Sequence, residues 1–409
     1  MSIVWRLAWR NLWRHRRRTW LTVGAMVFCN VLLIFLIALQ LGSYDMMIRN
    51  SLGPVTGHAQ VQHSDYREEG KMRQTVHAAE ALAQDIRAVP GVASVAVRAI
   101  GFALASSEER SYGIQLTGVQ PAFETQVSTL PGMVSQGRYL QPDSVDEIVI
   151  GSVLARNLRV GPGDELVFIG SARDGSTAAA AATVVGIVET GFEDADRAMA
   201  QVHLDWFQEV FAMGDQAHAI VIRVPRLEDL PGTLPAIRAV MPEGDSPVLL
   251  DWEQLEPGLR QAITSDMTSA WFMYLVLIFL VAFSVLNTQL MSVMERTREF
   301  GIMLSLGMRP GVLARLVGME TLLLSALGLG LGVLGGAILT AYLAVEGFTF
   351  PGMEEMAAQF NLSAKMYPQV SALALLWGPG TVFVGAMLAC IYPATRLFRL
   401  QPVAAMRAA

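Results

Sequence analysis

Four apolar stretches constrain this chain most, because each is long enough to cross a lipid bilayer. They cover 20–41, 270–291, 316–345 and 370–392. A hydrocarbon core about 30 Å thick needs about 20 apolar residues in a helix. Only 16% of the residues are charged while 53% are hydrophobic, which leaves too few charges for the surface of a soluble protein of this size. The sequence therefore predicts an α-helical membrane protein with four transmembrane helices.

The segment between the first and second stretches has a different character. Residues 43–269 are polar and turn-rich, and short β-branched runs alternate there with amphipathic helical runs. We expect a large extracytoplasmic α+β domain with two lobes, inserted between helices 1 and 2. Its residues 121–213 would be an insert in a core built from the residues on either side. The Ala-rich stretch within 170–182 is predicted to be an exposed loop with little to pack against.

Basic residues predict the orientation. The short flanks before the first span, between the second and third spans and after the fourth carry 13 of the 30 Lys and Arg residues. An even number of spans puts these flanks on one side, and the positive-inside rule makes that side cytoplasmic. Both termini are then cytoplasmic. The large loop holds 30 of the 36 acidic residues and 16 basic ones, which argues against nucleic acid as a partner.

The N-terminal residues before the first span have a helical pattern of their own. Trp5, Trp9 and Trp13 recur every four residues, and a stripe of arginines lies beside them. Aromatic rings at headgroup depth with guanidinium groups toward phosphate are typical of a helix in the membrane interface. We therefore predict a cytoplasmic interfacial helix at 1–18.

A dense charged segment follows the second span. It carries four charges within five residues and then a short apolar helical stripe, a combination that suits a helix docking into the groove of a partner. The residues alone equally allow a solvated cytoplasmic turn. The residues of this candidate contact are Glu295, Arg296, Arg298, Glu299, Phe300, Met303 and Leu304.

The third span contains small residues and one carboxylate. Gly328, Gly332 and Gly336 form two overlapping GxxxG spacings, which favour close helix packing in lipid. Glu320 lies near the cytoplasmic end of this span, where an ionised carboxylate is costly unless paired. We expect a structural ion pair with an arginine, for which the sequence offers Arg315 and the arginines of the charged segment.

The sequence lacks three motifs that would indicate phosphate binding, metal binding or a catalytic nucleophile. It contains no G-x-x-x-x-G-K-[ST] phosphate loop, no H-E-x-x-H metal motif and no G-x-S-x-G nucleophile motif. Neither cysteine lies in the external domain, so no disulfide is expected there. We predict no catalytic residue, no metal site and no cofactor on this chain.

Several motifs together resemble those of FtsX-like permeases. The charged segment continues as Glu299-Phe300-Gly301-Ile302 and reaches a glycine at Gly307, as in the cytoplasmic signature of that family. Motifs of the family's external domain follow in order, among them Gly137-Arg138-Tyr139-Leu140 and Val160-Gly161-Pro162-Gly163-Asp164. Tyr392-Pro393-Ala394-Thr395-Arg396 resembles the family's tail. Within the family, the size and the 1+3 arrangement of spans look most like the LolC and LolE permeases.

The resemblance implies a permease subunit of an ATP-driven ABC transporter of the mechanotransmission type, in a bacterial inner membrane. Two permeases, as a homodimer or a heterodimer, would work with two copies of a separate ATPase subunit that binds ATP and Mg. The charged segment would couple this chain to the ATPase. The transporter would extract lipoproteins or another amphipathic substrate from the membrane, and membrane lipid is a further expected contact.

The resemblance also implies a surface for acyl chains between spans one and two. The candidate residues form one stripe on each span, although such stripes can equally pack or meet lipid. They are Phe28, Leu32, Phe35 and Leu39 on span one, and Trp271, Tyr274, Leu275 and Ile278 on span two.

These expectations divide the chain into nine segments. They are the interfacial helix at 1–18, the first span at 19–42, the periplasmic MacB-like domain at 43–269, the second span at 270–292, the coupling helix at 293–312, the third span at 313–345, a periplasmic loop at 346–369, the fourth span at 370–393 and a cytoplasmic tail at 394–409.

Two other functions stay open at this point. One is a MacB-like efflux permease for peptides or drugs that works with an adaptor. The other is an FtsX-like activator of a periplasmic cell-wall hydrolase. A periplasmic carrier is a further expected partner of a LolC-like permease, although the proline-bearing hook that recruits it in LolC is shorter here and lacks proline.

Overall fold

The computed structural model describes residues 3–14, 16–244, 246–349, 351–352 and 365–400. The chain divides into two compact units. One is helical and is built from residues before 47 together with 263–349 and 365–400. The other is an α/β unit within 47–262. Each is described by itself below.

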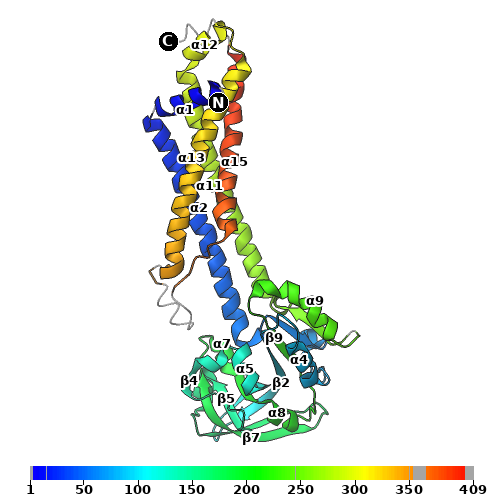
Figure 1. The fold of residues 1–409 in the computed structure, drawn as a ribbon. Helices are drawn as coiled ribbons and strands as arrows, with labels where there is room; N and C mark the ends of the chain where they lie inside the picture. Colours follow the sequence, from blue (N-terminus) through cyan, green and yellow to red (C-terminus); the bar gives the residue numbers. More distant parts are fainter. Residues whose placement is uncertain (1–2, 15, 245, 350, 353–364, 401–409) are drawn as a thin grey trace. The chain divides into compact units, whose positions relative to one another are not determined.

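Four long helices dominate the helical unit (Figure 1). They are α2 (Arg16–Ser51), α11 (Pro257–Glu295), α13 (Pro310–Glu346) and α15 (Ala372–Arg396). All four are long and apolar enough to cross a membrane. The prediction of four apolar helices is therefore confirmed. The predicted loop at 346–369 and the predicted tail at 394–409 lie largely outside the described residues.

Short helices gather at one end of this unit. α1 (Ile3–Arg14), α12 (Thr297–Ser305) and the turn η4 (Leu397–Arg399) pack around one buried cluster. Ala8 and Leu12 of α1 contribute to that cluster, and Trp5 and Trp13 are partly buried against it. The N-terminal segment is thus a packed part of the helical unit as well as a basic helix.

The glycines of α13 bring it close to α2. A Cβ atom at Gly328, Gly332 or Gly336 would lie 2.7, 2.5 or 2.6 Å from Met26, Asn30 or Ile34, distances that real Cβ atoms do not show. Asn30 also donates a hydrogen bond from Nδ2 to the Gly328 carbonyl oxygen at 3.2 Å. The GxxxG spacing therefore lies in a close helix contact, as small residues do in lipid.

The α/β unit contains a single ten-stranded sheet. Its strands are β1 (Ala59–Gln62), β2 (Ser94–Ser106), β3 (Ser111–Val119), β4 (Val134–Gly137), β5 (Glu147–Gly151), β6 (Glu165–Ser171), β7 (Thr177–Val188), β8 (Met199–His203), β9 (Ala219–Arg223) and β10 (Val248–Asp251). Their order is β10-β1-β9-β2-β3-β8-β5-β7-β4, with β6 paired to β2 and β7. The predicted insert at 121–213 supplies β4 to β8 of this same sheet, so the prediction of two lobes is wrong.

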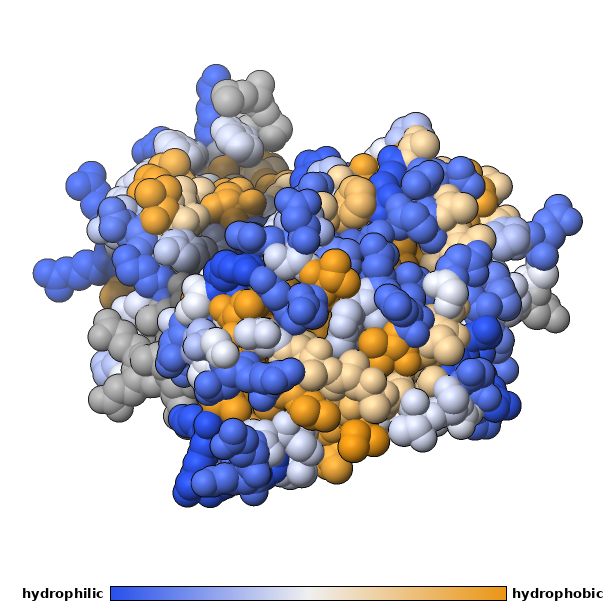
Figure 2. Space-filling model, turned by 90° about the horizontal axis from the view of Figure 1, so that it is seen from below, coloured by the Kyte–Doolittle hydropathy of each residue, from blue (hydrophilic) through white to orange (hydrophobic). Residues whose placement is uncertain are grey.

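Helices cover the sheet and complete its core. The longer ones are α4 (Ala79–Arg87), α5 (Pro121–Val127), α6 (Ser152–Leu158), α8 (Leu204–Val210) and α9 (Leu230–Val240). Shorter ones are α3 (Tyr66–Glu69), α7 (Glu193–Ala198), α10 (Trp252–Leu255), η1 (Leu52–Thr56), η2 (Leu130–Met133) and η3 (Leu227–Asp229). Phe168, Phe207 and Phe211 are among the largest fully buried side chains. Figure 2 shows apolar areas between the hydrophilic residues of one face of the molecule.

The Ala-rich stretch within 170–182 differs from its prediction. It belongs to β7, which pairs antiparallel with β6 from Glu165↔Thr183 to Ser171↔Thr177. Ala178 and Ala182 are buried in the core. Alanine is less common in strands than β-branched residues are, but strand pairing and burial override that tendency here. Only the turn at 172–176 connects the two strands, so the predicted exposed loop is wrong.

Candidate functional site

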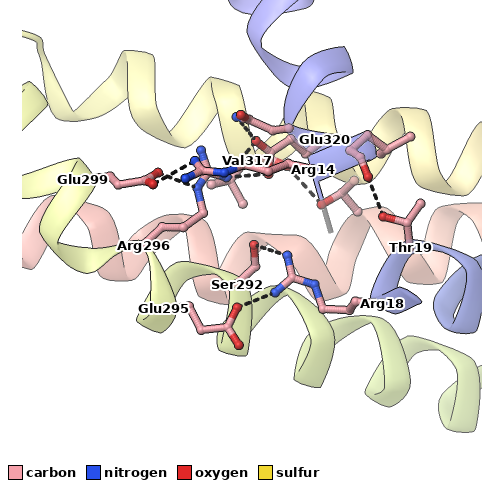
Figure 3. Close-up of polar contacts among 12 residues, drawn as sticks. Arg14, Arg18, Thr19, Ser292, Glu295, Arg296, Glu299, Val317 and Glu320 are labelled. Atoms are coloured by element: carbon pink, nitrogen blue, oxygen red, sulfur yellow. Dashed lines mark hydrogen bonds and ion pairs between the residues drawn. The ribbon is translucent and has the colours of Figure 1, made fainter. Parts of the chain in front are cut away.

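A polar network joins α1, α2, α11, α12 and α13 at one end of the helical unit (Figure 3). Its centre is an ion pair between Arg296 and Glu320. Arg296 Nη1 lies 2.9 Å from Glu320 Oε1 and 3.1 Å from Oε2. Each side chain is only 8% exposed. Several arginines were candidates to pair with Glu320, and in the structure the partner is Arg296.

Further donors and acceptors satisfy this buried pair. Asn11 of α1 donates from Nδ2 to Glu320 Oε1 at 2.7 Å. Arg296 Nε donates to Glu299 Oε2 at 3.3 Å. Two buried charges repay their desolvation only when such extra hydrogen bonds complete the geometry. Arg296 also lies over the ring of Phe300, with its Cζ atom 4.9 Å from the ring centroid.

Two outer ion pairs tie the N-terminal helices to the charged segment. Arg14 Nη1 lies 2.8 Å from Glu299 Oε1, and Arg18 Nη1 lies 2.8 Å from Glu295 Oε2. Arg18 also donates to Ser292 Oγ at 2.9 Å. Burial raises the pKa of Glu299, but hydrogen bonds and charge from Arg296 and Arg14 outweigh it, so its pKa lies below the usual value. The carboxylate of Glu299 thus stays ionised at neutral pH and holds α1 and α12 together.

The apolar stripe of the charged segment faces inward. Phe300 is fully buried, and Met303 and Leu304 are partly buried against the same cluster. The exposed apolar side chains are instead Ile302, at 45%, and Leu306, at 82%. The prediction that Phe300 presents itself to a partner is therefore wrong, because it fills the core under Arg296.

The outward face of this segment has a regular spacing. Arg298, Ile302 and Leu306 follow one another at intervals of four, and all three are exposed. Residues four apart lie on one side of a helix. Gly307 then takes a positive φ of +92° after α12 ends, a conformation that glycine adopts without strain. The sequence contained this i, i+4 spacing, but the more apolar inward stripe concealed it.

The two predicted acyl-chain stripes do not face each other. Tyr274 is only 6% exposed and lies in a cluster with Met26, Leu33 and Ile37 of α2. Of the other predicted residues on α11, Ile278 packs partly against that cluster, while Trp271 and Leu275 are exposed. The face of α2 that packs against α11 is therefore a different one from the predicted stripe that begins at Phe28.

The predicted stripe on α2 lies elsewhere. Phe28 is 68% exposed, and Leu32, Phe35 and Leu39 have intermediate exposure. The ring of Phe35 packs against Phe348, beyond the end of α13, with a centroid distance of 5.5 Å. Tyr274 consequently cannot line an open surface, whereas Phe28, Trp271 and Leu275 can still meet an apolar molecule.

A second polar cluster links α2 to α11, and its residues Tyr44 and Asp266 were not predicted from the sequence. Tyr274 Oη donates to Gln40 Oε1 at 2.5 Å. Tyr44 Oη and Gln40 Nε2 both donate to Asp266 Oδ2, at 2.7 and 3.1 Å. Polar groups inside or beside a membrane need such partners. In the part of the chain that the structure describes, no group of three or more His, Cys, Asp or Glu residues could hold a metal ion.

Four helices long and apolar enough to cross a membrane are the make-up of a polytopic membrane protein. Comparison with known proteins gives the class: residues 271–402 match the family described as FtsX-like permease C-terminal. The chain thus resembles the FtsX-like permeases of ABC transporters, and the resemblance predicted from its motifs is confirmed.

Individual relatives carry the name LolC. The chain is 26% identical over 315 residues to "Lipoprotein-releasing system transmembrane protein LolC" of Xylella fastidiosa strain 9a5c, covering 73% of this chain and 74% of that protein. It is 23% identical over 391 residues to the protein of the same name from Neisseria meningitidis serogroup B, covering 90% and 88%.

Solved structures show weaker similarity. The periplasmic region of MacB from Actinobacillus actinomycetemcomitans is 12% identical, with a TM-score of 0.37, and the match covers 52% of this chain and 97% of that one. The extracellular domain of the ABC-type transporter YknZ from Gram-positive bacteria is 16% identical, with a TM-score of 0.34, and the match covers 45% and 91%. These TM-scores are too low to support a conclusion.

Proposed function

We propose that this chain is the permease subunit of a mechanotransmission-type ABC transporter that releases lipoproteins, or a similar amphipathic substrate, from the inner membrane. The observation that carries the proposal is the outward face of α12, fixed to α1 and α13 by a buried ion network. The substrate class is supported by two relatives that are named as lipoprotein-releasing proteins. Their alignments cover 73% and 90% of this chain.

The topology that the sequence predicted is part of this proposal. The α1–α12 end of the helical unit, with its arginines, is cytoplasmic, and the acidic α/β unit is periplasmic. The ATPase subunit, in two copies with ATP and Mg, then meets α12 from the cytoplasm. A second permease, the same chain or a homologue, completes the transporter. This chain itself takes no catalytic part.

Coupling requires a contact surface and a rigid connection behind it. Arg298, Ile302 and Leu306 offer a charged and apolar surface of the kind that fits a partner's groove. Behind them, Arg296 connects α12 to Glu320 of α13, and Glu299 connects it to Arg14 of α1. A displacement of α12 by the ATPase would therefore move α13 and α1 with it.

In this proposal the substrate contacts the exposed apolar residues of α2 and α11. Phe28 of α2 and Trp271 and Leu275 of α11 are open to an acyl chain, whereas Tyr274 is part of the packed interior. Acyl chains gain about 0.8 kcal/mol for each buried CH₂ group, so an apolar surface of this kind suits a lipidated substrate. A carrier or an adaptor in the periplasm stays a prediction.

Depletion of the protein in its own host tests the function. Lipoproteins of the inner and outer membranes are quantified by mass spectrometry before and after depletion, with a wild-type copy restored as the control. We expect lipoproteins to accumulate in the inner membrane and to return on restoration. An unchanged distribution, in a host without a paralogue, would contradict lipoprotein release and favour the efflux or hydrolase-activating function.

A further inference from the structure

Arginines surround a hollow on the surface where α1 meets α2. The hollow has a volume of about 470 Å³. The residues that line it are Trp13, Arg14, Arg16, Arg17, Arg18 and Glu295. Four positive charges against one negative charge leave the lining of this hollow net positive, which favours an anion.

Only two of these four arginines form ion pairs with carboxylates of the described residues. Arg14 and Arg18 pair with Glu299 and Glu295. Arg16 and Arg17 are exposed, and neither has a carboxylate partner among the residues that the structure describes. Both residues line the same hollow, so each guanidinium group is available to donate hydrogen bonds to the oxygens of an anion there.

An apolar surface adjoins the hollow. The rings of Trp9, Trp13 and Trp20 form a row with edge contacts, at centroid distances of 5.9 and 6.2 Å. Trp20 is 56% exposed and Leu21 is 76% exposed at the start of the apolar part of α2. A soluble anion would use only the guanidinium groups, whereas a phospholipid would use both the charges and this apolar row.

We propose that this hollow binds the phosphate headgroup of an anionic phospholipid, with its acyl chains along Trp20 and Leu21. The assignment needs only that α2 enters the membrane, and it does not depend on what the transporter carries. The bound headgroup lies beside Arg14 and Arg18, which also hold the carboxylates of the charged segment. The lipid is therefore placed next to the proposed coupling helix.

Native mass spectrometry of the full-length protein in a nonionic detergent tests the site. The protein is titrated separately with phosphatidylglycerol and phosphatidylcholine. Wild type should bind phosphatidylglycerol in preference. The double variant Arg16→Gln/Arg17→Gln should weaken that binding at least about tenfold, because each arginine near an anionic headgroup contributes several-fold to the affinity.

The matched control is Arg309→Gln/Arg315→Gln, which removes the same charge from exposed positions at the start of α13, outside the hollow. It should leave phosphatidylglycerol binding within about twofold of wild type. Equal losses in the two double variants would show diffuse attraction and overturn the proposal, as would unchanged binding in Arg16→Gln/Arg17→Gln. Displacement of the lipid by millimolar inorganic phosphate would identify a free-phosphate site instead. If the double variant aggregates, the single variants Arg16→Gln and Arg17→Gln should each lower binding several-fold.

Discussion

At the scale of single residues, the ion pair between Arg296 and Glu320 decides how the charged segment is held. Both side chains are nearly inaccessible, and Asn11 supplies a third polar contact. The sequence predicted that Glu320 would be paired, because a carboxylate in a span is costly. It could not name the partner, because several arginines lie within a few turns and only the packing of Phe300 under Arg296 brings that one inward.

Removing one member of this pair should be more harmful than removing both. Glu320→Gln removes the closer of the two counter-charges of the buried Arg296 and leaves it only the contact with Glu299 at 3.3 Å, which should lower the free energy of unfolding by about 3–5 kcal/mol. The double variant Arg296→Met/Glu320→Leu should recover most of that loss. Thermal unfolding in detergent measures both, and a Glu320→Gln protein as stable as wild type would contradict the role of the pair.

At the scale of elements, the close contact of α13 with α2 depends on glycine. Gly332→Leu should destabilise the helical unit by about 1–3 kcal/mol or more, because its Cβ would lie 2.5 Å from that of Asn30. Gly330→Leu is the matched control, since no atom lies within 4 Å of its added Cβ. Unfolding temperatures in detergent should separate the two variants, and equal values would show that α2 and α13 can move apart at no cost.

Elements differ in how far the sequence predicts them. The four long helices follow from local apolar length, and the glycine spacing already indicated a packed face on α13. The single sheet was missed because its strands pair across large separations, as when β1 lies between β9 and β10. The β6–β7 hairpin was missed because alanine gives little strand signal, and only the register with β6 buries Ala178 and Ala182.

The direction in which side chains point around a helix could also not be predicted from the sequence. The inward stripe of α12 is more apolar than its outward stripe, so Phe300 was predicted to meet a partner although it is fully buried. Apolar residues cover every side of α11, so nothing in the sequence indicated that Tyr274 is packed against α2 and closed to an acyl chain. Apolar character within a membrane helix does not tell a packed face from a lipid face.

At the scale of the whole molecule, the proposal places the ATPase contact at the outward face of α12. Glu295 and Glu299 belong to internal ion pairs with Arg18 and Arg14, so replacing them would disturb the network as well as any contact. Ile302 and Leu306 are better probes, since they are exposed and take no part in that network. Phe398, 61% exposed in η4, provides the same substitution outside α12.

The most direct measurement is ATP hydrolysis by the permease purified with the ATPase subunit of its host. Ile302→Glu/Leu306→Glu should release the ATPase or reduce permease-dependent hydrolysis at least about tenfold, because carboxylates would be buried in an apolar groove without partners. Phe398→Glu should keep both the bound ATPase and its activity. An Ile302→Glu/Leu306→Glu protein that retains the ATPase and hydrolyses ATP like wild type would contradict coupling through α12.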